Sequence, residues 1–377
     1  MAQTISIDAN RQELWSKDLM DDVMRDVENV MRFAGEDDNN VVQIKRDLKK
    51  EKGDTQNFGM VGRLRGDGVT GDNELEGNEE SQKSFNEQVA IDQIRNAVRL
   101  SGKLDAQKVV YSQIEKAREG CRVWLKEFIA RNIFLKLGGV TNTGLTNVHG
   151  KVVGTRAAWS NTPDYIPDAD EAYTGTRLRY LNAGGVTTAS LSTSHTMTLD
   201  VVTSAATMAA LSEPQIQRIS GQGEDFWVMY LHPLQGAQIR KSSDWKTAQE
   251  NARVRSDNNP VFRGALGFWS NVLLLENEFA PWLDVSVAGN SFRGSATGTD
   301  CAVDAARAVL CGRGAVVMAE ASNPNALVME TFDYKNIEGV ACSFIGGIQK
   351  PVFAAGGSAG TTAVEYGVLA VDSYATI

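Results

Sequence analysis

The sequence predicts a mixed α+β protein of 377 residues with one long helix and one long polar hairpin. Apolar residues recur at helical spacing between residues 104 and 137, and the stretches that flank a glycine-rich acidic segment at residues 66–80 are closer to strand-like alternation. Helix-like and strand-like segments then alternate through the second half of the chain. This mixture is typical of the α+β class.

Composition and charge narrow the functional classes. Apolar residues make up 42% of the chain and charged residues 23%, as in a soluble globular protein. No run of about 18 apolar residues predicts a membrane span, and the first ten residues lack the basic and apolar stretches of a secretory signal. The four cysteines are too few for a disulfide framework in so long a chain and suit a reducing cytoplasm.

The net charge of −9 is concentrated at the N-terminal end. Residues 1–90 hold 12 Lys/Arg against 20 Asp/Glu, whereas the other 287 residues hold 26 against 27. Because no basic stripe is available to neutralise a phosphate backbone, tight nucleic-acid binding is not expected.

A short amphipathic helix is predicted at about residues 12–33, ended by Gly35 and the acidic residues that follow it. Its apolar positions are Leu14, Leu19, Val23, Val27 and Val30. The next elements are two arms of a long hairpin, at residues 57–64 and 85–91, with residues 66–80 as its tip.

The hairpin tip is too polar and too rich in glycine to build a core of its own. A loop of this length is unusual inside a compact domain, so we expect it to pack on another subunit. The candidate inter-subunit contacts are its charged residues: Arg63, Arg65, Asp67, Asp72, Glu74, Glu76, Glu79 and Glu80.

The strongest element is a helix predicted over residues 104–137. Six residues at spacings of four and three form one apolar face, the core stripe of this helix: Val110, Ile114, Ala117, Cys121, Trp124 and Phe128. Gly138 and Gly139 end it. Such a helix would be about 50 Å long, which is more than a small globule requires.

The remaining chain is predicted to be mixed. Residues 138–195 are rich in Gly, Thr, Asn and Ser and suggest irregular structure, with a short strand-like piece at 177–181. Helices are expected at 199–211, 234–252 and 303–321. Strands are expected at 226–231, 272–276, 326–330, 339–345, 350–353 and 367–371.

Two glycine motifs raise an enzymatic hypothesis. Gly66–Gly71 matches G-x-G-x-x-G, but a dinucleotide site needs a buried strand before it and an apolar helix after it, and acidic residues follow here. Gly356–Gly360 matches G-x-S-x-G around Ser358, but all three histidines precede it and the residues after it are strand-like. We therefore expect a loop tip and a turn.

A metal centre and a cofactor are likewise not expected. The cysteines form no C-x-x-C pair, the histidines are isolated, and the acidic residues of the hairpin tip do not have the spacing of an EF-hand. The hypothesis that two carboxylates perform acid–base catalysis stays open, because any two acidic residues can meet in a fold and nothing in the sequence selects a pair.

The sequence resembles the N4-type phage major capsid proteins over most of residues 55–372. The strongest match is the segment 64–80, and weaker ones follow at 231–235, 259–267, 307–312, 333–336, 346–351 and 366–368. Residues 138–195 match least.

The resemblance implies an HK97-like capsid fold. Its parts would be an N-terminal arm (1–52), an extended loop (53–92), a peripheral domain (93–195) with a spine helix at 104–137 and an insertion at 138–195, an axial domain (196–338), and strands that return to the peripheral domain (339–377).

The resemblance also implies a structural, non-enzymatic function. The expected protein forms hexamers and pentamers of an icosahedral shell around double-stranded DNA, is assembled in the host bacterial cytoplasm and resides in the virion capsid. Expected partners are copies of itself, a portal, a decoration protein and packaged DNA in weak non-specific contact. Because the arm begins almost at Met1, a separate scaffolding protein is also expected. Subunit contacts are expected to be non-covalent.

Two alternatives stay open at this point. One is the shell of a cellular nanocompartment with the same fold, which would enclose an enzyme instead of DNA, since a fold alone does not define a function. The other is an enzyme that uses the Gly66–Gly71 loop or Ser358.

Overall fold

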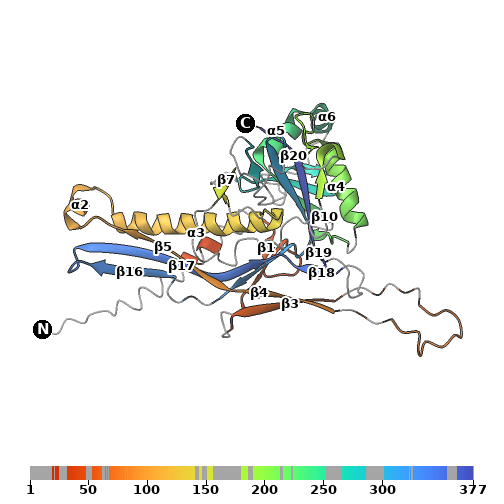
Figure 1. Cartoon of the computed structure of the whole chain (residues 1–377), viewed down its shortest axis with the longest axis horizontal. Coiled ribbons are helices and arrows are strands. Elements are labelled where there is room, and N and C mark those ends of the chain that lie inside the picture. The colour runs from red at the N-terminus through yellow and green to blue at the C-terminus, as the bar shows by residue number, and fades with distance from the viewer. Residues whose placement is uncertain are drawn as a thin grey trace.

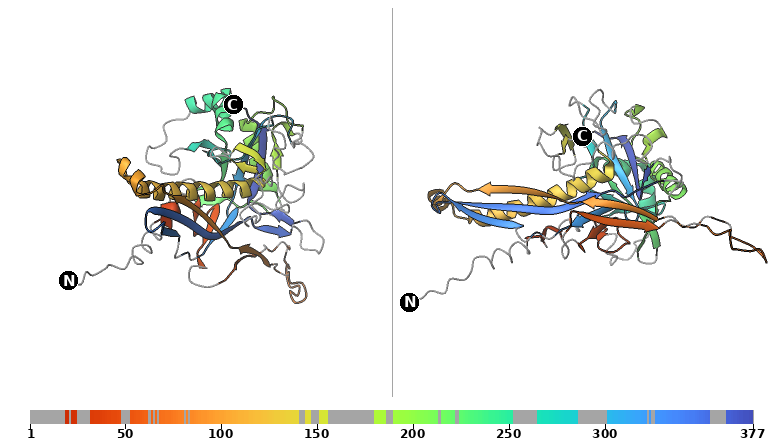
Figure 2. Two further views of the ribbon diagram at one scale, coloured as in Figure 1. Left: turned by 60° about the vertical axis from the view of Figure 1, so that its left-hand side comes forward. Right: turned by 60° about the horizontal axis from the view of Figure 1, so that its bottom comes forward.

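The computed structural model describes residues 19–20, 22–24, 32–47, 53–61, 64, 66, 68–80, 82, 84–140, 144–146, 151–155, 180–185, 190–212, 215–221, 224–251, 265–285, 301–321, 323, 326–354 and 363–376. Figure 1 shows three parts: a long flat layer that contains the longest helix, a compact lobe at one end of it, and a hairpin that extends away from both. Figure 2 shows the molecule from two other sides, and in its right-hand view the long layer and the projecting hairpin again extend in opposite directions.

The longest helix is α3, Gln113–Gly138, and its ends follow from local chemistry. Ser112 caps the start, where its hydroxyl accepts a hydrogen bond from the Glu115 amide. Gly139 ends it in the left-handed conformation, with φ of 59°, and donates its amide to the carbonyl of Lys136. The 26 residues span about 39 Å at 1.5 Å per residue.

The predicted single helix over residues 104–137 was wrong at its N-terminal end. Residues Lys103–Lys108 form a separate short helix, α2, and Val109 after it is extended. Val110 lies outside both helices and is fully exposed, so it is not part of the core stripe. The helix is interrupted here because β-branched Val109 and Val110 favour extended backbone. Ser112 then caps the start of α3.

The first sheet has six strands and lies along α3, with which it forms the long flat layer. At its centre is β17, Ile337–Gln349, which pairs along one side with β5 (Asp92–Arg99). Its other side pairs first with β16 (Leu327–Phe332) and then with β15 (Val316–Glu320). The sheet is completed by β2 (Val42–Lys45) and β1 (Ala34–Gly35).

The second sheet has ten strands and forms the lobe. Its two best-paired strands are β14 (Ala305–Cys311) and β20 (Val368–Tyr374), which run antiparallel over their whole length. The other strands are β6 (Gly144–Thr146), β7 (Lys151–Thr155), β8 (Tyr180–Asn182), β9 (Ile219–Gly221), β10 (Glu224–Leu231), β11 (Ala265–Trp269), β12 (Val272–Glu276) and β13 (Trp282–Leu283).

Short helices and hairpins complete the described chain. The lobe carries α4 (Leu199–Leu211), α5 (Pro233–Lys241), α6 (Ser243–Asn251) and the 3₁₀ turn η2 (Ala183–Gly185). Two further hairpins are β3–β4 (Thr55–Val61 and Ser84–Ala90) and β18–β19 (Val352–Ala354 and Ala363–Glu365). Within the described residues, no helix is long and apolar enough to cross a membrane.

Two further helix predictions needed correction. The expected helix at 303–321 is instead two strands of different sheets, β14 and β15, separated by the tight turn Gly312–Gly314, where Gly314 has φ of 64°. Alanine content favours a helix in isolation, but every residue of both strands is buried, and sheet packing outweighs propensity there. The expected helix at 234–252 is interrupted at Ser242, giving α5 and α6.

The helix at 199–211, the arms of the long hairpin and the strands from 226 onward lie close to their predicted positions. Of the helix predicted at 12–33, the structure describes residues 19–20 and 22–24, which are helical, with Leu19 and Val23 buried. Leu14, Val27 and Val30 lie outside the described residues.

The chain crosses between the two sheets differently from the expected boundaries. The strands β15 and β16, expected with the axial part, belong to the sheet of β5 and β17. In the expected returning segment 339–377, β17 joins β5, but β20 instead pairs with β14 in the lobe. Strand order is decided by pairing partners that are distant in sequence, which local patterns do not reveal.

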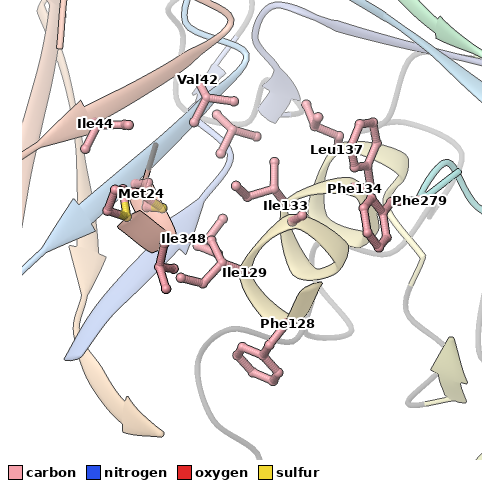
Figure 3. Packing of buried hydrophobic residues seen from close by; sticks show 14 of the residues in the cluster. Met24, Val42, Ile44, Phe128, Ile129, Ile133, Phe134, Leu137, Phe279 and Ile348 are labelled. Carbon is pink, nitrogen blue, oxygen red and sulfur yellow. The ribbon is translucent and has the colours of Figure 1, made fainter. Parts of the chain in front are cut away.

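The main core lies around the C-terminal half of α3. From Phe128 to Gly138, every residue except Arg131 is buried, as expected for a helix covered on all sides. Figure 3 shows Ile129 of α3 close to Ile348 of β17, and Phe134 and Leu137 close to Phe279. Since this core also includes Val228, Tyr230 and Val309 of the lobe, it joins the two sheets into one body.

Candidate assembly interface

The base of the hairpin β3–β4 is fixed on the first sheet. Val89 of β4 is buried against Val317 and Ala319 of β15. The close approach depends on Gly347 of β17, where an added Cβ would lie 2.0 Å from the carbonyl oxygen of Ala90. The hairpin therefore leaves the body in a defined direction.

Beyond Val61, the hairpin continues as a segment that we call the loop tip (residues 62–83). In Figure 1 it extends away from the rest of the molecule. Its described residues are exposed except for the half-buried Val69, and they include two large apolar side chains, Leu64 and Leu75. A segment with so little burial is incomplete as a folded unit and suits contact with another chain.

Local hydrogen bonds shape the loop tip. Asn73 Nδ2 donates to the Thr70 carbonyl at 2.7 Å, and Asn78 Nδ2 donates to the Glu74 carbonyl at 3.0 Å. Gly71 and Gly77 have positive φ values of 71° and 89°. Residues other than glycine adopt this backbone conformation only at a cost in free energy, so glycine suits both turns. These turns position the acidic side chains between them.

The predicted contact residues of the loop tip fall into three groups. Glu79 and Glu80 accept hydrogen bonds from the amides of Gly77 and Gly66, at 2.8 and 2.6 Å, and so stabilise the loop itself. Three others are exposed: Asp72, Glu74 and Glu76. Arg63, Arg65 and Asp67 lie outside the described residues.

The geometry does not support the cofactor hypothesis for Gly66–Gly71. The motif lies in the exposed loop tip, and turns instead of a helix follow it at residues 71–80. A helix N-terminus, which a pyrophosphate needs, is missing from this position. Ser358 lies outside the described residues, and within the described part of the chain no group of three or more His, Cys, Asp or Glu could hold a metal ion.

Apart from Val110, the predicted core stripe of the long helix lies on the face of α3 toward the first sheet. Ala117, Cys121 and Phe128 are buried, while Ile114 and Trp124 are half-buried and pack against the same core. Trp124 also stacks on Phe128, with ring centroids 5.5 Å apart. The sequence pattern missed how far this core continues, through Leu125, Ile129 and Ile133, because burial there involves both sheets.

A second exposed surface lies at the opposite end of the flat layer, and sequence reasoning did not predict it. We call it the spine end (residues 100–112 and 332–336). The two segments are adjacent, since the Leu100 amide donates to the Glu338 carbonyl and the Arg99 guanidinium lies 4.8 Å from the Phe332 ring centroid. Its exposed apolar residues are Leu104, Val110, Tyr111, Phe332 and Tyr334.

The turn at the spine end holds its aromatic residues outward by an unusual backbone. Asp333, Tyr334 and Lys335 have φ values of 52°, 49° and 67°, in the left-handed region that costs free energy for residues other than glycine. The sequence signal that could have revealed this surface is the pair of aromatic residues Phe332, at the end of β16, and Tyr334, in the turn that follows.

The loop tip and the chain segment 93–127 carry net charges of opposite sign. Residues 66–80 of the loop tip contain six Asp/Glu and no Lys/Arg. Residues 93–127, which we call the spine side, include the first segment of the spine end (100–112) and the first half of α3, and they contain eight Lys/Arg and four Asp/Glu. One of these acids is already paired: the hydrogen bond from Arg122 lowers the pKa of Glu119. The spine side therefore offers an excess of positive charge.

An elongated body with an exposed projecting hairpin is typical of a subunit that packs against copies of itself. The chain matches the family described as phage capsid protein over residues 3–377 and belongs to that family. It is 27% identical to the major capsid protein of Pseudomonas phage KPP25 over 344 residues, which cover 90% of this chain and 89% of that protein.

Solved structures show the same fold. The capsid of Ralstonia phage GP4 is similar with a TM-score of 0.69 and 27% identity, and the match covers 92% of this chain and 90% of that one. The capsid of cyanophage Pam1 has a TM-score of 0.68 at 21% identity, with 91% of both chains covered. The protein therefore has the HK97-like fold and serves as a structural shell protein.

Proposed function

We propose that this chain is an N4-type major capsid protein that forms hexamers and pentamers of an icosahedral shell around double-stranded DNA. It would be assembled in the host bacterial cytoplasm and would reside in the virion capsid. A separate scaffolding protein, a portal and a decoration protein are the further partners of this proposal. The observation that carries it is the loop tip, which is exposed in the single chain and leaves the body in a fixed direction.

The loop tip of one copy lies across the spine side of the next copy. Charge supports this contact, because the acidic loop tip faces a segment with excess Lys and Arg. Apolar burial adds to it: Leu64 and Leu75 are 61% and 60% exposed, and covering each would contribute about 1–2 kcal/mol. In a closed shell every subunit makes the same contact, so many small free-energy contributions add up.

Deletion of residues 66–80 tests the proposal. The strands β3 and β4 and their packing on the first sheet stay intact, so the subunit should fold but fail to assemble. Circular dichroism reports folding, while size-exclusion chromatography and negative-stain microscopy report particles. Normal shells from the deletion variant would overturn the role of the loop tip.

The particles formed by the unaltered chain distinguish the phage shell from a nanocompartment. Large shells, or shells that package DNA when the remaining phage components are present, support the proposal. Small particles filled with a co-purifying protein would instead indicate a compartment.

A further inference from the structure

Two buried cysteines meet where the long helix packs on the central strand of the first sheet. Cys121 belongs to α3 and Cys342 to β17, 221 positions later in the chain. The Cys342 Sγ atom lies 4.0 Å from the carbonyl oxygen of Cys121, so the side chain from the strand reaches the helix backbone. Both belong to the main core, with 3% and 1% of their surface exposed.

The pairing of these positions follows from the periodicity of the two elements. Val340, Cys342 and Phe344 are buried alternate residues of β17 on the face toward α3. On the helix, Ala117 and Cys121 are four residues apart and belong to the same core. A small side chain on each element at the same level permits the close approach that a disulfide requires.

The two thiols also differ in reactivity. The hydrogen bond between the side chains lowers the pKa of Cys121 and raises the pKa of Cys342, and burial raises the latter further. Cys121 lies in the less covered half of α3, beside the exposed Glu119 and Gly120, so it is the thiol that an oxidant meets first, and the thiolate is the reacting form.

We propose that Cys121 and Cys342 form an intrachain disulfide when the protein meets a small-molecule disulfide such as oxidised glutathione. The Cys121 thiolate attacks one sulfur of the oxidant, which forms a mixed disulfide and releases one reduced glutathione. Cys342 then loses its proton and attacks the Cys121 sulfur, which releases the second glutathione. The protein loses two electrons and two protons, and the oxidant gains them.

Access to the pair arises by local opening of the helix. Cys121 lies in the first half of α3, where its neighbours Glu119 and Gly120 are exposed, whereas the second half is buried on all sides. Partial opening at the less buried end of a helix requires less free energy than global unfolding. The bond, once formed, fixes α3 to β17 and closes a loop of about 220 residues, which restricts the unfolded chain strongly.

The experiment uses the purified full-length chain, prepared with reductant and then exchanged into oxidised glutathione. Free thiols are then alkylated in denaturant, and intact mass and non-reducing peptide maps are recorded. We expect two alkylated thiols instead of four, a mass lower by two hydrogen atoms in a sample that is left unalkylated, a peptide pair that links Cys121 to Cys342, and a thermal midpoint raised by several degrees. Chain denatured before oxidation serves as the control for reagent activity.

Single variants identify the pair. Cys121→Ser should keep all three remaining thiols under the same treatment, whereas Cys342→Ser should stop at the mixed disulfide between Cys121 and glutathione and keep two. Cys311→Ser should still lose two, because the Cys311 thiol is buried within the second sheet, 3.8 Å from the Val309 carbonyl oxygen. In the unaltered folded chain, four alkylated thiols, a persistent glutathione adduct, or a crosslink that involves Cys301 or Cys311 would overturn the proposal.

Discussion

Arg307 and Asp372 form a fully buried, two-point ion pair between the central strands of the lobe. The guanidinium Nε and Nη2 atoms donate to the two carboxylate oxygens at 2.7 and 2.8 Å, and both side chains are at most 1% exposed. The third donor, Nη1, bonds the Gly138 carbonyl at 2.8 Å, at the C-terminal end of α3. One side chain thereby joins β14, β20 and the long helix.

Removal of one partner of this pair should destabilise the subunit strongly. Arg307→Met leaves the Asp372 carboxylate buried without its partner, and we expect a loss of about 3–5 kcal/mol in the free energy of unfolding. Urea unfolding of the unassembled subunit measures it. The control is Arg240→Met, which breaks a more exposed pair with Glu276 and should cost about 1 kcal/mol or less. Equal losses in the two variants would contradict this account.

The close contact at Gly347 should be intolerant of a side chain. In Gly347→Ala, the new Cβ would clash with backbone of the hairpin, and we expect a destabilisation of about 1–3 kcal/mol from the forced shift. In the matched control Gly120→Ala, nothing lies within 4 Å of the new Cβ in the middle of α3, so stability should rise by about 0.5–1 kcal/mol. Thermal unfolding of both variants decides the matter.

The exposed apolar residues of the spine end should matter for assembly and not for folding. Leu104→Ser combined with Tyr334→Ser removes two side chains that are 74% and 104% exposed. We expect the melting temperature of the subunit to change by less than about 2 °C, because little buried surface is lost. The yield of particles in sedimentation should fall. Unchanged particle yield would mean that this surface is not an inter-subunit contact.

Charge reversal in the loop tip should weaken assembly, and a second charge reversal on the partner surface should restore it. The triple variant Asp72→Lys, Glu74→Lys, Glu76→Lys places like charges against the spine side, and assembly followed by light scattering should slow most at low salt. The neutral variant with Asn, Gln and Gln at these positions should be affected less.

A compensating change tests the partner surface. Lys103→Glu, Lys108→Glu and Lys116→Glu introduced into the reversed variant should restore assembly if the exposed lysines of the spine side receive the loop tip. If assembly of the doubly reversed chain stays as poor as that of the loop-tip variant, the loop tip contacts another surface.

Much of the secondary structure was predictable because it follows from short-range patterns. The hairpin strands and the helix at 199–211 are set by local periodicity and turn residues. The helix break before Ser112 was not predicted, because Val110 continues the apolar spacing and only the capping hydrogen bond reveals the new start. The strands of residues 305–320 were missed because their alanines favour a helix until a sheet surrounds them.

The candidate interface was predictable in part for the same reason. An acidic, glycine-rich segment without apolar periodicity indicates an exposed loop, but it does not show which acids are used within the loop. Glu79 and Glu80 accept hydrogen bonds because the turns bring the backbone amides of Gly77 and Gly66 close to them, which the sequence does not reveal. The spine end depends on two segments more than 200 residues apart in the chain, so no local pattern could reveal it.

The amino-acid sequence by itself determined the α+β class, the polar hairpin and most of the helix that supports the core, because residue periodicity and turn chemistry act over a few positions. The tertiary structure decided which strands pair, where Arg307 meets Asp372, and that Cys121 lies against Cys342. These contacts join residues far apart in the chain, and their free energy arises only when both segments are buried together.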